Sequence, residues 1–114
     1  MEKIFDKLME HNLNPYFIGQ HEGLCEERFV VIKDMGQMPS VGTNTTGQQI
    51  IDIIPFVPAE DYVKMLPYKK EIKAALKELN HIRKSGIETP DIADDDKKAY
   101  TTSIQYTVYK KLEG

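Results

Sequence analysis

The most constraining feature of the sequence is a run of apolar residues between Gln49 and Val57, in which both alternating faces are apolar. Only Asp52 interrupts this run with a charge. A strand with two apolar faces has to be covered on both sides, so we expect it to be central in a sheet or covered on both faces. Pro55 cannot donate a backbone hydrogen bond. Either the pairing of the strand ends at Pro55, or this position faces an unpaired edge.

Two segments show the apolar spacing of helices. In residues 1–11, apolar side chains recur at helical spacing between charged residues: Ile4, Phe5, Leu8 and Met9. A second stripe follows the spacing of a helix packed on a sheet: Tyr68, Ile72, Ala75, Leu76 and Leu79. Proline is tolerated in the first turn of a helix but not in its interior, so this helix should begin near Pro67. Residues 60–66 are then a separate short turn that leads into it.

Three further segments are predicted as strands. Residues 28–33 are rich in β-branched and aromatic side chains, and a brief strand is expected around residues 81–83. Residues 100–109 alternate with a period of two, and one side carries Tyr100, Thr102, Ile104, Tyr106 and Val108. With residues 49–57 these make four strands. The sequence therefore predicts a single α+β domain over residues 1–114, with an antiparallel or mixed four-stranded sheet and helices packed on one face.

Two long loops are predicted between these elements. Residues 34–48 are rich in Gly, Ser, Thr and Asn, a composition that does not support compact packing by itself. Residues 86–97 form the second loop, which is acidic. The first loop also contains the apolar residues Met35, Met38 and Val41, and methionines suit surfaces that adapt to a partner. We interpret these three residues as interface candidates, and the alternative is that they pack onto the core of their own chain.

Few side chains have the arrangement that bond chemistry requires. The histidines (His11, His21 and His81) share no metal-ligand spacing with one another or with Cys25, which is the only cysteine. A lone cysteine fits a reducing compartment and a buried apolar position. Asp94, Asp95 and Asp96 are consecutive, whereas a calcium loop alternates its ligands and has a glycine at the turn. We therefore expect no catalytic residues, no cofactor and no metal.

Charge and hydropathy argue against two kinds of partner. The net charge of −3 gives no general attraction for phosphate backbones, so specific nucleic-acid binding is not expected. No apolar run reaches the roughly 18 residues of a membrane span. Residues 1–9 also lack the uninterrupted apolar stretch of a secretory signal. The sequence thus predicts a protein that is neither membrane-bound nor exported.

Two stretches of the chain resemble tail-terminator, or tail-completion, proteins of phages and prophages of Gram-positive bacteria. The first runs from Ile51 to Pro58 and continues through Asp61-Tyr62 and the helix to Leu79. The second runs from Glu88 to Lys111. Together they cover roughly the last two thirds of the chain. The likeness lies in the order and character of the segments, since the family has no catalytic signature.

The resemblance implies a structural protein of the virion neck that is made in the cytoplasm of the bacterial host. Such a protein forms a ring, usually of six subunits, that caps the head-proximal end of the tail tube and offers a docking surface to the head connector. Its implied partners are copies of itself, the tail-tube protein and the connector protein. Tyr109 is then a further interface candidate, because tyrosine is enriched where protein surfaces meet. Asp94, Asp95 and Asp96 are candidates to face the channel, where negative charge would keep passing DNA from sticking.

Two alternative functions fit the same pattern of residues. A head-tail adaptor or stopper is also a small ring-forming domain, and it differs in the neighbour that it contacts. A small ligand-binding or regulatory module would need a concave pocket and would be a monomer. Neither alternative is an enzyme.

Overall fold

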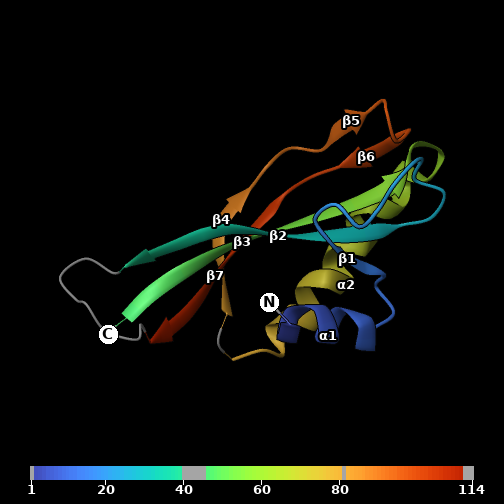
Figure 1. Cartoon of the computed structure of the whole chain (residues 1–114). Coiled ribbons are helices and arrows are strands. Elements are labelled where there is room, and N and C mark those ends of the chain that lie inside the picture. The colour runs from blue at the N-terminus through green and yellow to red at the C-terminus, as the bar shows by residue number, and fades with distance from the viewer. Residues whose placement is uncertain (1, 40–45, 81, 112–114) are drawn as a thin grey trace.

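The computed structural model describes residues 2–39, 46–80 and 82–111, and forms two α-helices and a seven-stranded mixed sheet (Figure 1). The helices are α1 (Glu2–Glu10) and α2 (Met65–Lys77), and the 3-10 helix η1 (Ala59–Lys64) leads into α2. The strands are β1 (Pro15–Phe17), β2 (Phe29–Pro39), β3 (Thr46–Pro58), β4 (Ile82–Glu88), β5 (Ile92–Asp94), β6 (Ala99–Thr101) and β7 (Ile104–Lys111). The predicted α+β class is confirmed, but the sheet has seven strands instead of four.

β3 is the central strand, as its two apolar faces predict. On one side it pairs antiparallel with β2, and on the other it pairs with β7 as far as Ile53 and with β6 from Phe56. Pro55 lies between these last two pairings, so its missing backbone donor coincides with a break in the ladder. The carbonyl of Pro55 accepts a hydrogen bond of 2.9 Å from the hydroxyl of Thr101. Of the two outcomes expected for Pro55, the structure therefore has the end of a pairing.

The strand predicted over residues 100–109 is split in two. β6 pairs with β5 and β7 pairs with β4, so the chain changes partners between Thr101 and Ile104. Thr89, between β4 and β5, stabilises the chain at this change of partners. Its N–H donates to the carbonyl of Ser103, and its hydroxyl accepts from the N–H of Ser103, both at 2.9 Å. β1 completes the sheet by pairing parallel with β2.

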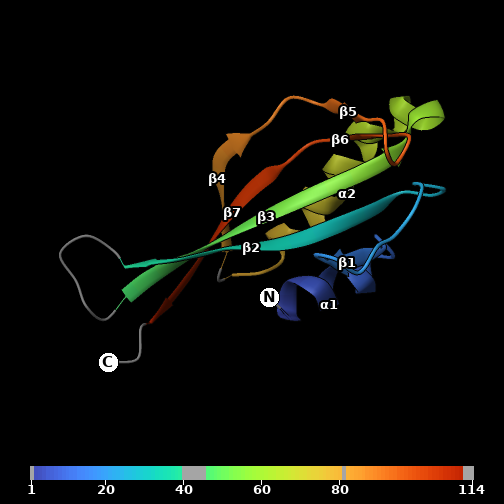
Figure 2. The same cartoon turned by 45° about the horizontal axis from the view of Figure 1, so that its top comes forward.

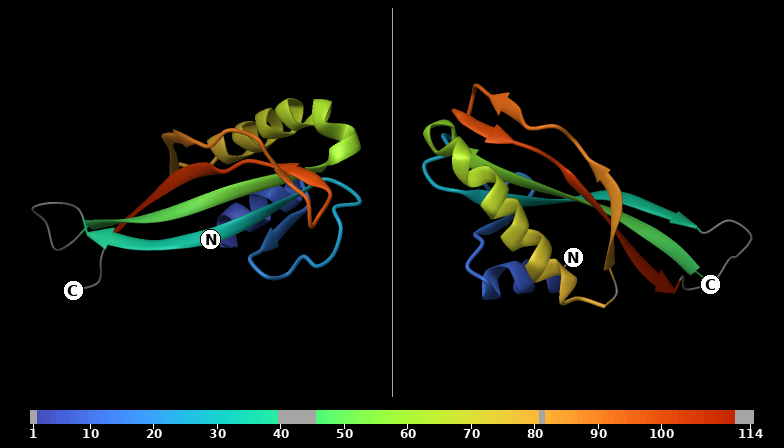
Figure 3. Two further views of the ribbon diagram at one scale, coloured as in Figure 1. Left: turned by 90° about the horizontal axis from the view of Figure 1, so that it is seen from above. Right: turned by 180° about the vertical axis from the view of Figure 1, so that it is seen from behind.

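Both helices pack into one hydrophobic core with one face of the sheet, and α2 crosses that face in the view from behind (Figure 3). α1 contributes Ile4 and Leu8, which are fully buried. The sheet contributes alternate residues of β2, β3 and β7: Val30, Ile32, Ile51, Ile53, Ile104, Tyr106 and Val108. Complete burial of an aliphatic or aromatic side chain stabilises the fold by about 1.5–3 kcal/mol. This core is therefore the main source of stability.

The helices begin and end where their residues predict. Pro67 is the third residue of α2, within the first turn, where its missing N–H removes no helical hydrogen bond. α1 ends at Glu10, and Asn12 in the turn that follows has a left-handed φ of 58°, while the N–H of Leu13 donates to the carbonyl of Leu8 at 3.0 Å. This is the hydrogen bond that closes a helix after a left-handed residue.

Both predicted loops are largely strand, so the prediction of a loop over residues 34–48 was wrong for most of its length. β2 continues to Pro39 and β3 begins at Thr46, although the residues that join them are rich in turn formers. Gly86 to Glu88 likewise belong to β4, and Ile92 to Asp94 to β5. Backbone hydrogen bonds from neighbouring strands hold these polar residues extended, and no apolar pattern in the sequence marks such pairing.

Candidate interaction surfaces

Three strands continue beyond the helices and form an arm, which consists of residues 34–39 of β2, 46–50 of β3 and 107–111 of β7 (Figures 1 and 2). The molecule is correspondingly elongated and measures 48 × 25 × 24 Å. In the arm β3 lies between β2 and β7 and pairs with both. Among the described residues, β1 pairs with β2 only as far as Ile32 and β4 pairs with β7 only as far as Val108, so the outer edges of β2 and β7 have no strand partner beyond these points.

A β-bulge marks the base of the arm. The register between β2 and β3 shifts between Asp34 and Gly36, and Gly36 has a φ of 110°. The carboxylate of Asp34 accepts one hydrogen bond from the N–H of Gly36 and one from the side-chain amide of Gln49, each at 2.8 Å. Met35 is the extra residue of this bulge, and 49% of its surface is exposed. A bulge of this kind turns a side chain away from its regular direction.

The structure places three of the four predicted interface residues on the arm. Met35 lies at its base, and the backbones of Met38 and Tyr109 lie at one level, on either side of Gln48. Met38 and Tyr109 are far apart in the sequence, so no local pattern indicated that they come together. Val41, the fourth candidate, lies outside the described residues.

The sheet face opposite the helices forms a second surface, which we call the open face. Its residues alternate with those of the core along β2, β3 and β7: Val31, Lys33, Ile50, Asp52, Ile54, Gln105 and Thr107. Most of these side chains are partly exposed. Within the ranges that the structure describes, no helix lies over this face (Figure 3).

One end of the open face is covered by the segment between β1 and β2, which carries an aromatic stack. The ring of His21 stacks on Phe29 with centroids 3.7 Å apart, and Phe29 stacks on Phe56 at 4.6 Å. Burial, and then the ammonium group of Lys97, lower the pKa of His21. Cys25 is buried beside this stack, and burial raises the pKa of its thiol to about 11. Both side chains are therefore neutral packing groups at physiological pH.

Of the three consecutive aspartates, Asp94 is the last residue of β5, and Asp95 and Asp96 lie in the turn between β5 and β6, at the end of the molecule away from the arm (Figure 1). Asp94 shapes this turn, since its carboxylate accepts a hydrogen bond of 3.2 Å from the N–H of Lys97. Asp95 and Asp96 are exposed, and neither has a salt bridge to a described residue. We call this segment, residues 94–98, the acidic turn.

No protein-family model matches the chain, and no curated protein sequence matches it. In the part of the chain that the structure describes, no helix is long and apolar enough to cross a membrane, and no three acidic, histidine or cysteine side chains are grouped to hold a metal ion. Of the histidines, His11 pairs with Glu78 at 2.8 Å, His21 lies in the aromatic stack, and His81 falls outside the described residues.

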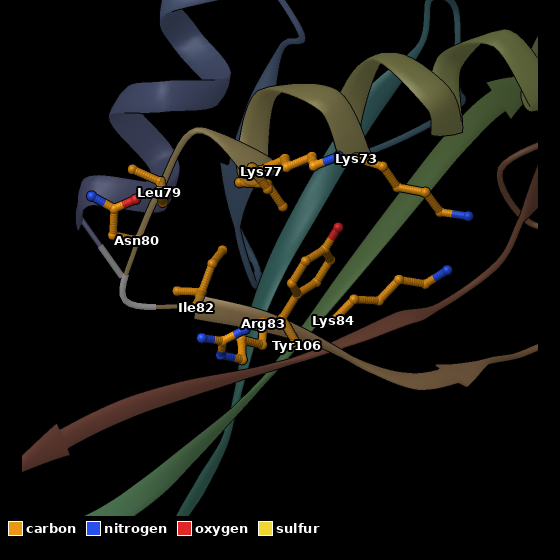
Figure 4. Close-up of a pocket in the computed structure, with 9 residues that line it drawn as sticks. Lys73, Lys77, Leu79, Asn80, Ile82, Arg83, Lys84 and Tyr106 are labelled. Carbon is orange, nitrogen blue, oxygen red and sulfur yellow. The ribbon is translucent and has the colours of Figure 1, made fainter.

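A third surface is a basic pocket of about 560 Å³ between the end of α2 and the start of β4 (Figure 4). Its cationic residues come from both elements: Lys73, Lys77, Arg83 and Lys84. The ring of Tyr106 rises into it from β7, with lysine side chains around it (Figure 4). This pocket was not predicted from the sequence, because α2 and β4 become neighbours only in the folded chain. The one local signal was the spacing of Lys73 and Lys77, which share a face of α2.

The field of this pocket favours negative charge. Glu88 lies at its edge and pairs with Lys73 at 2.8 Å. The hydrogen bond from Lys73 and the charges of Lys73, Lys69 and Lys84 lower the pKa of Glu88. Burial and the nearby Glu88 raise the pKa of Tyr106 to about 12, so its hydroxyl keeps its proton and can donate. Lys77, Arg83 and Lys84 form no salt bridge with any residue that the structure describes.

Proposed function

We propose that this chain is a structural protein of the phage neck, which caps the head-proximal end of the tail tube and presents a docking surface to the head connector. It acts as a ring, six subunits being the number that the resemblance implies. The observation that carries the proposal is the arm, which has the exposed Met35 at its base and whose outer edges have no strand partner beyond Ile32 and Val108 among the described residues.

An arm of this kind supports a function in assembly on energetic grounds. Ordering a residue costs about 1–2 kcal/mol of backbone entropy, which burial normally offsets. No described helix lies over the arm, so contact with a neighbour would supply burial that the helices give to the rest of the sheet. An unpaired strand edge also binds another chain by extending its sheet. The open face adds a broad, partly apolar area beside the arm.

The proposal is tested by mixing the purified protein with the tail-tube protein and, separately, with the connector protein of the same phage. Electron microscopy should show rings at one end of the tubes, and tubes should stop growing when the protein is added. Binding to the connector alone would identify a head-tail adaptor instead. A protein that binds neither component would contradict any function in the neck.

Substitution of the arm sharpens this test. Met35→Asp places a charge on the exposed base of the arm, so it should abolish tube binding while the thermal midpoint stays near that of the wild type. Met9→Asp is the matched control, since Met9 is 53% exposed on α1 and Met35 is 49% exposed on the arm. If both variants bind the tube equally well, the arm is not the contact surface.

The basic pocket favours a second candidate function, a small ligand-binding module, because it is the concave site that such a protein needs. The two functions differ in oligomeric state. Sedimentation at high protein concentration and in the presence of tail tubes distinguishes them. A protein that remains monomeric in both conditions favours the ligand-binding module.

A further inference from the structure

We infer that the basic pocket receives the acidic turn of a neighbouring copy, so that subunits join head to tail through Lys77 and Lys84 on one side and Asp95 and Asp96 on the other. This inference rests on the ring proposed above and names the charged contact that would close it. It assigns a partner to two surfaces that the fold itself leaves unpaired.

Charge is the first argument. The chain as a whole carries a net charge of −3, yet four cationic side chains from two elements line the pocket. Like charges held this close repel one another unless an anion lies between them. Lys73 has an anionic partner in Glu88, whereas Lys77, Arg83 and Lys84 have none among the described residues. The pocket therefore has capacity for a further anion.

Hydrogen bonding is the second argument, and it favours a carboxylate. Tyr106 is only 4% exposed, and its hydroxyl has no hydrogen-bond partner among the described residues. No fully buried side-chain nitrogen or oxygen of the described residues lacks a hydrogen-bond partner, so this hydroxyl is reachable from the pocket and can donate to a ligand that enters it. Asp95 and Asp96 offer carboxylates on a narrow hairpin that projects from the sheet, and both are exposed. The acidic turn is thus a ligand of the chemistry that the pocket requires.

Geometry is the third argument. The hairpin of β5 and β6, which carries the acidic turn, lies at one end of the body, and the end of α2 and the start of β4, which line the pocket, lie at the other (Figure 3). When the turn of one subunit enters the pocket of a second, the pocket of the first and the turn of the second remain free. Further subunits can therefore be added at both ends. Repetition of such a contact makes a ring when the rotation closes and a filament when it does not. Exposed charge pairs are individually weak, but a ring repeats the same contact between every pair of neighbours.

The test uses charge reversal in the full chain. Lys77→Glu/Lys84→Glu reverses two of the four cationic side chains that line the pocket, and Asp95→Lys/Asp96→Lys reverses the two exposed charges of the turn. Each variant alone should associate with itself at least about tenfold more weakly than the wild type, because like charges then meet. An equimolar mixture of the two variants should regain association, since reversed pockets meet reversed turns and unchanged pockets meet unchanged turns. Lys3→Glu/Lys70→Glu is the matched control and should leave association unchanged.

Two further measurements address the contact directly. Carbodiimide treatment of the wild type should join Asp95 or Asp96 to Lys77 or Lys84 of another subunit, which mass spectrometry of the dimer identifies. Tyr106→Phe keeps the ring and removes the hydroxyl, and it should weaken association by about two- to tenfold. Unchanged association of both charge-reversal variants, or cross-linked dimers without this pair of peptides, would overturn the inference.

The outcomes also distinguish this contact from phosphate binding in the pocket, from a turn that faces the channel, and from the proposed function in the neck. If the reversed pocket loses binding to a short DNA duplex while self-association is unchanged, the pocket holds phosphate and the contact is wrong. If the reversed turn leaves self-association unchanged, the acidic turn is free to face the channel and the contact is likewise wrong. If both charge-reversal variants cap tail tubes like the wild type, the inference fails and the proposed function stands. If the cross-link forms but no variant binds tubes, the contact stands and the proposed function fails.

Discussion

The hydroxyl of Tyr68 donates a hydrogen bond to the backbone carbonyl of Leu13, across a separation of 55 residues in the sequence. Tyr68 is completely buried in α2, and Leu13 follows α1 and is 1% exposed. Arg28, just before β2, lies over the same ring, with its guanidinium carbon 4.6 Å from the centroid. One side chain therefore joins α2, the end of α1 and the entry to β2. It fixes the two helices relative to each other on the sheet.

Removal of this hydroxyl should destabilise the fold. Tyr68→Phe keeps the packing of the ring but leaves the buried carbonyl of Leu13 without its donor, which costs about 1–3 kcal/mol. Urea denaturation measures the loss as a lower midpoint. The control is Tyr62→Phe, whose exposed hydroxyl donates to Asp91 at 2.8 Å and whose loss should cost less than about 0.5 kcal/mol. Equal costs for the two variants would show that the bond to Leu13 adds nothing to stability.

Gly36 is predicted to be essential for the base of the arm. Its φ of 110° is a conformation that other residues adopt only under strain, although no atom would obstruct a new Cβ. Gly36→Ala should therefore destabilise the arm by about 1–3 kcal/mol through backbone strain alone. Hydrogen exchange should become faster at arm amides such as that of Ile50 and remain unchanged in α2. Met35→Ala, at the neighbouring exposed position, should leave both regions unaffected.

His21 should make the stability of the protein depend on pH. Its pKa is lowered from the usual 6.5 in the folded chain, chiefly by burial. The unfolded chain therefore takes up a proton first as the pH falls below 6.5, and the free energy of unfolding decreases until the folded His21 is protonated as well. His21→Phe can stack on Phe29 without titrating, so its stability should vary less between about pH 7 and pH 5. Identical slopes for the wild type and this variant would contradict the assignment.

Cys25 should react slowly with thiol reagents in the folded protein. Burial raises the pKa of its thiol to about 11, and the residue is 5% exposed. Few molecules then carry the reactive thiolate at pH 8, so modification by an aromatic disulfide reagent should be at least about tenfold slower than in unfolding concentrations of urea. The chromophore released over time measures both rates. Equal rates would show that Cys25 is accessible in the native state.

Much of the fold was predictable where the buried face of an element produces a periodic spacing of apolar residues in the sequence. The stripe through Tyr68, Ile72 and Leu76 marked α2, and all three side chains are fully or almost fully buried. The double-faced apolar run marked β3 as central, and Pro55 marked a break in its pairing. These predictions succeed because the side chains of a single element determine which of its faces is buried.

The prediction of two long loops was wrong for a physical reason. Residues 34–39 and 46–48 have turn-forming compositions, yet they are extended because β2, β3 and β7 supply one another with backbone donors and acceptors. β4 was longer than predicted for the same reason, since Lys84 and Glu88 lie beyond the predicted strand and pair with β7 although both residues are exposed. Strand pairing between distant segments depends on backbone groups that every residue shares.

The sequence by itself determined the α+β class, the extent of α1 and α2, and the central place of β3, because each depends on the spacing of apolar side chains along one segment. Only the tertiary structure decided that three strands continue as an arm and that Met38 and Tyr109 lie at one level of it. It also decided that lysines of α2 and β4 surround the hydroxyl of Tyr106. These features join residues that are far apart in the chain, and their positions are set by the way in which the strands pair and the helices pack.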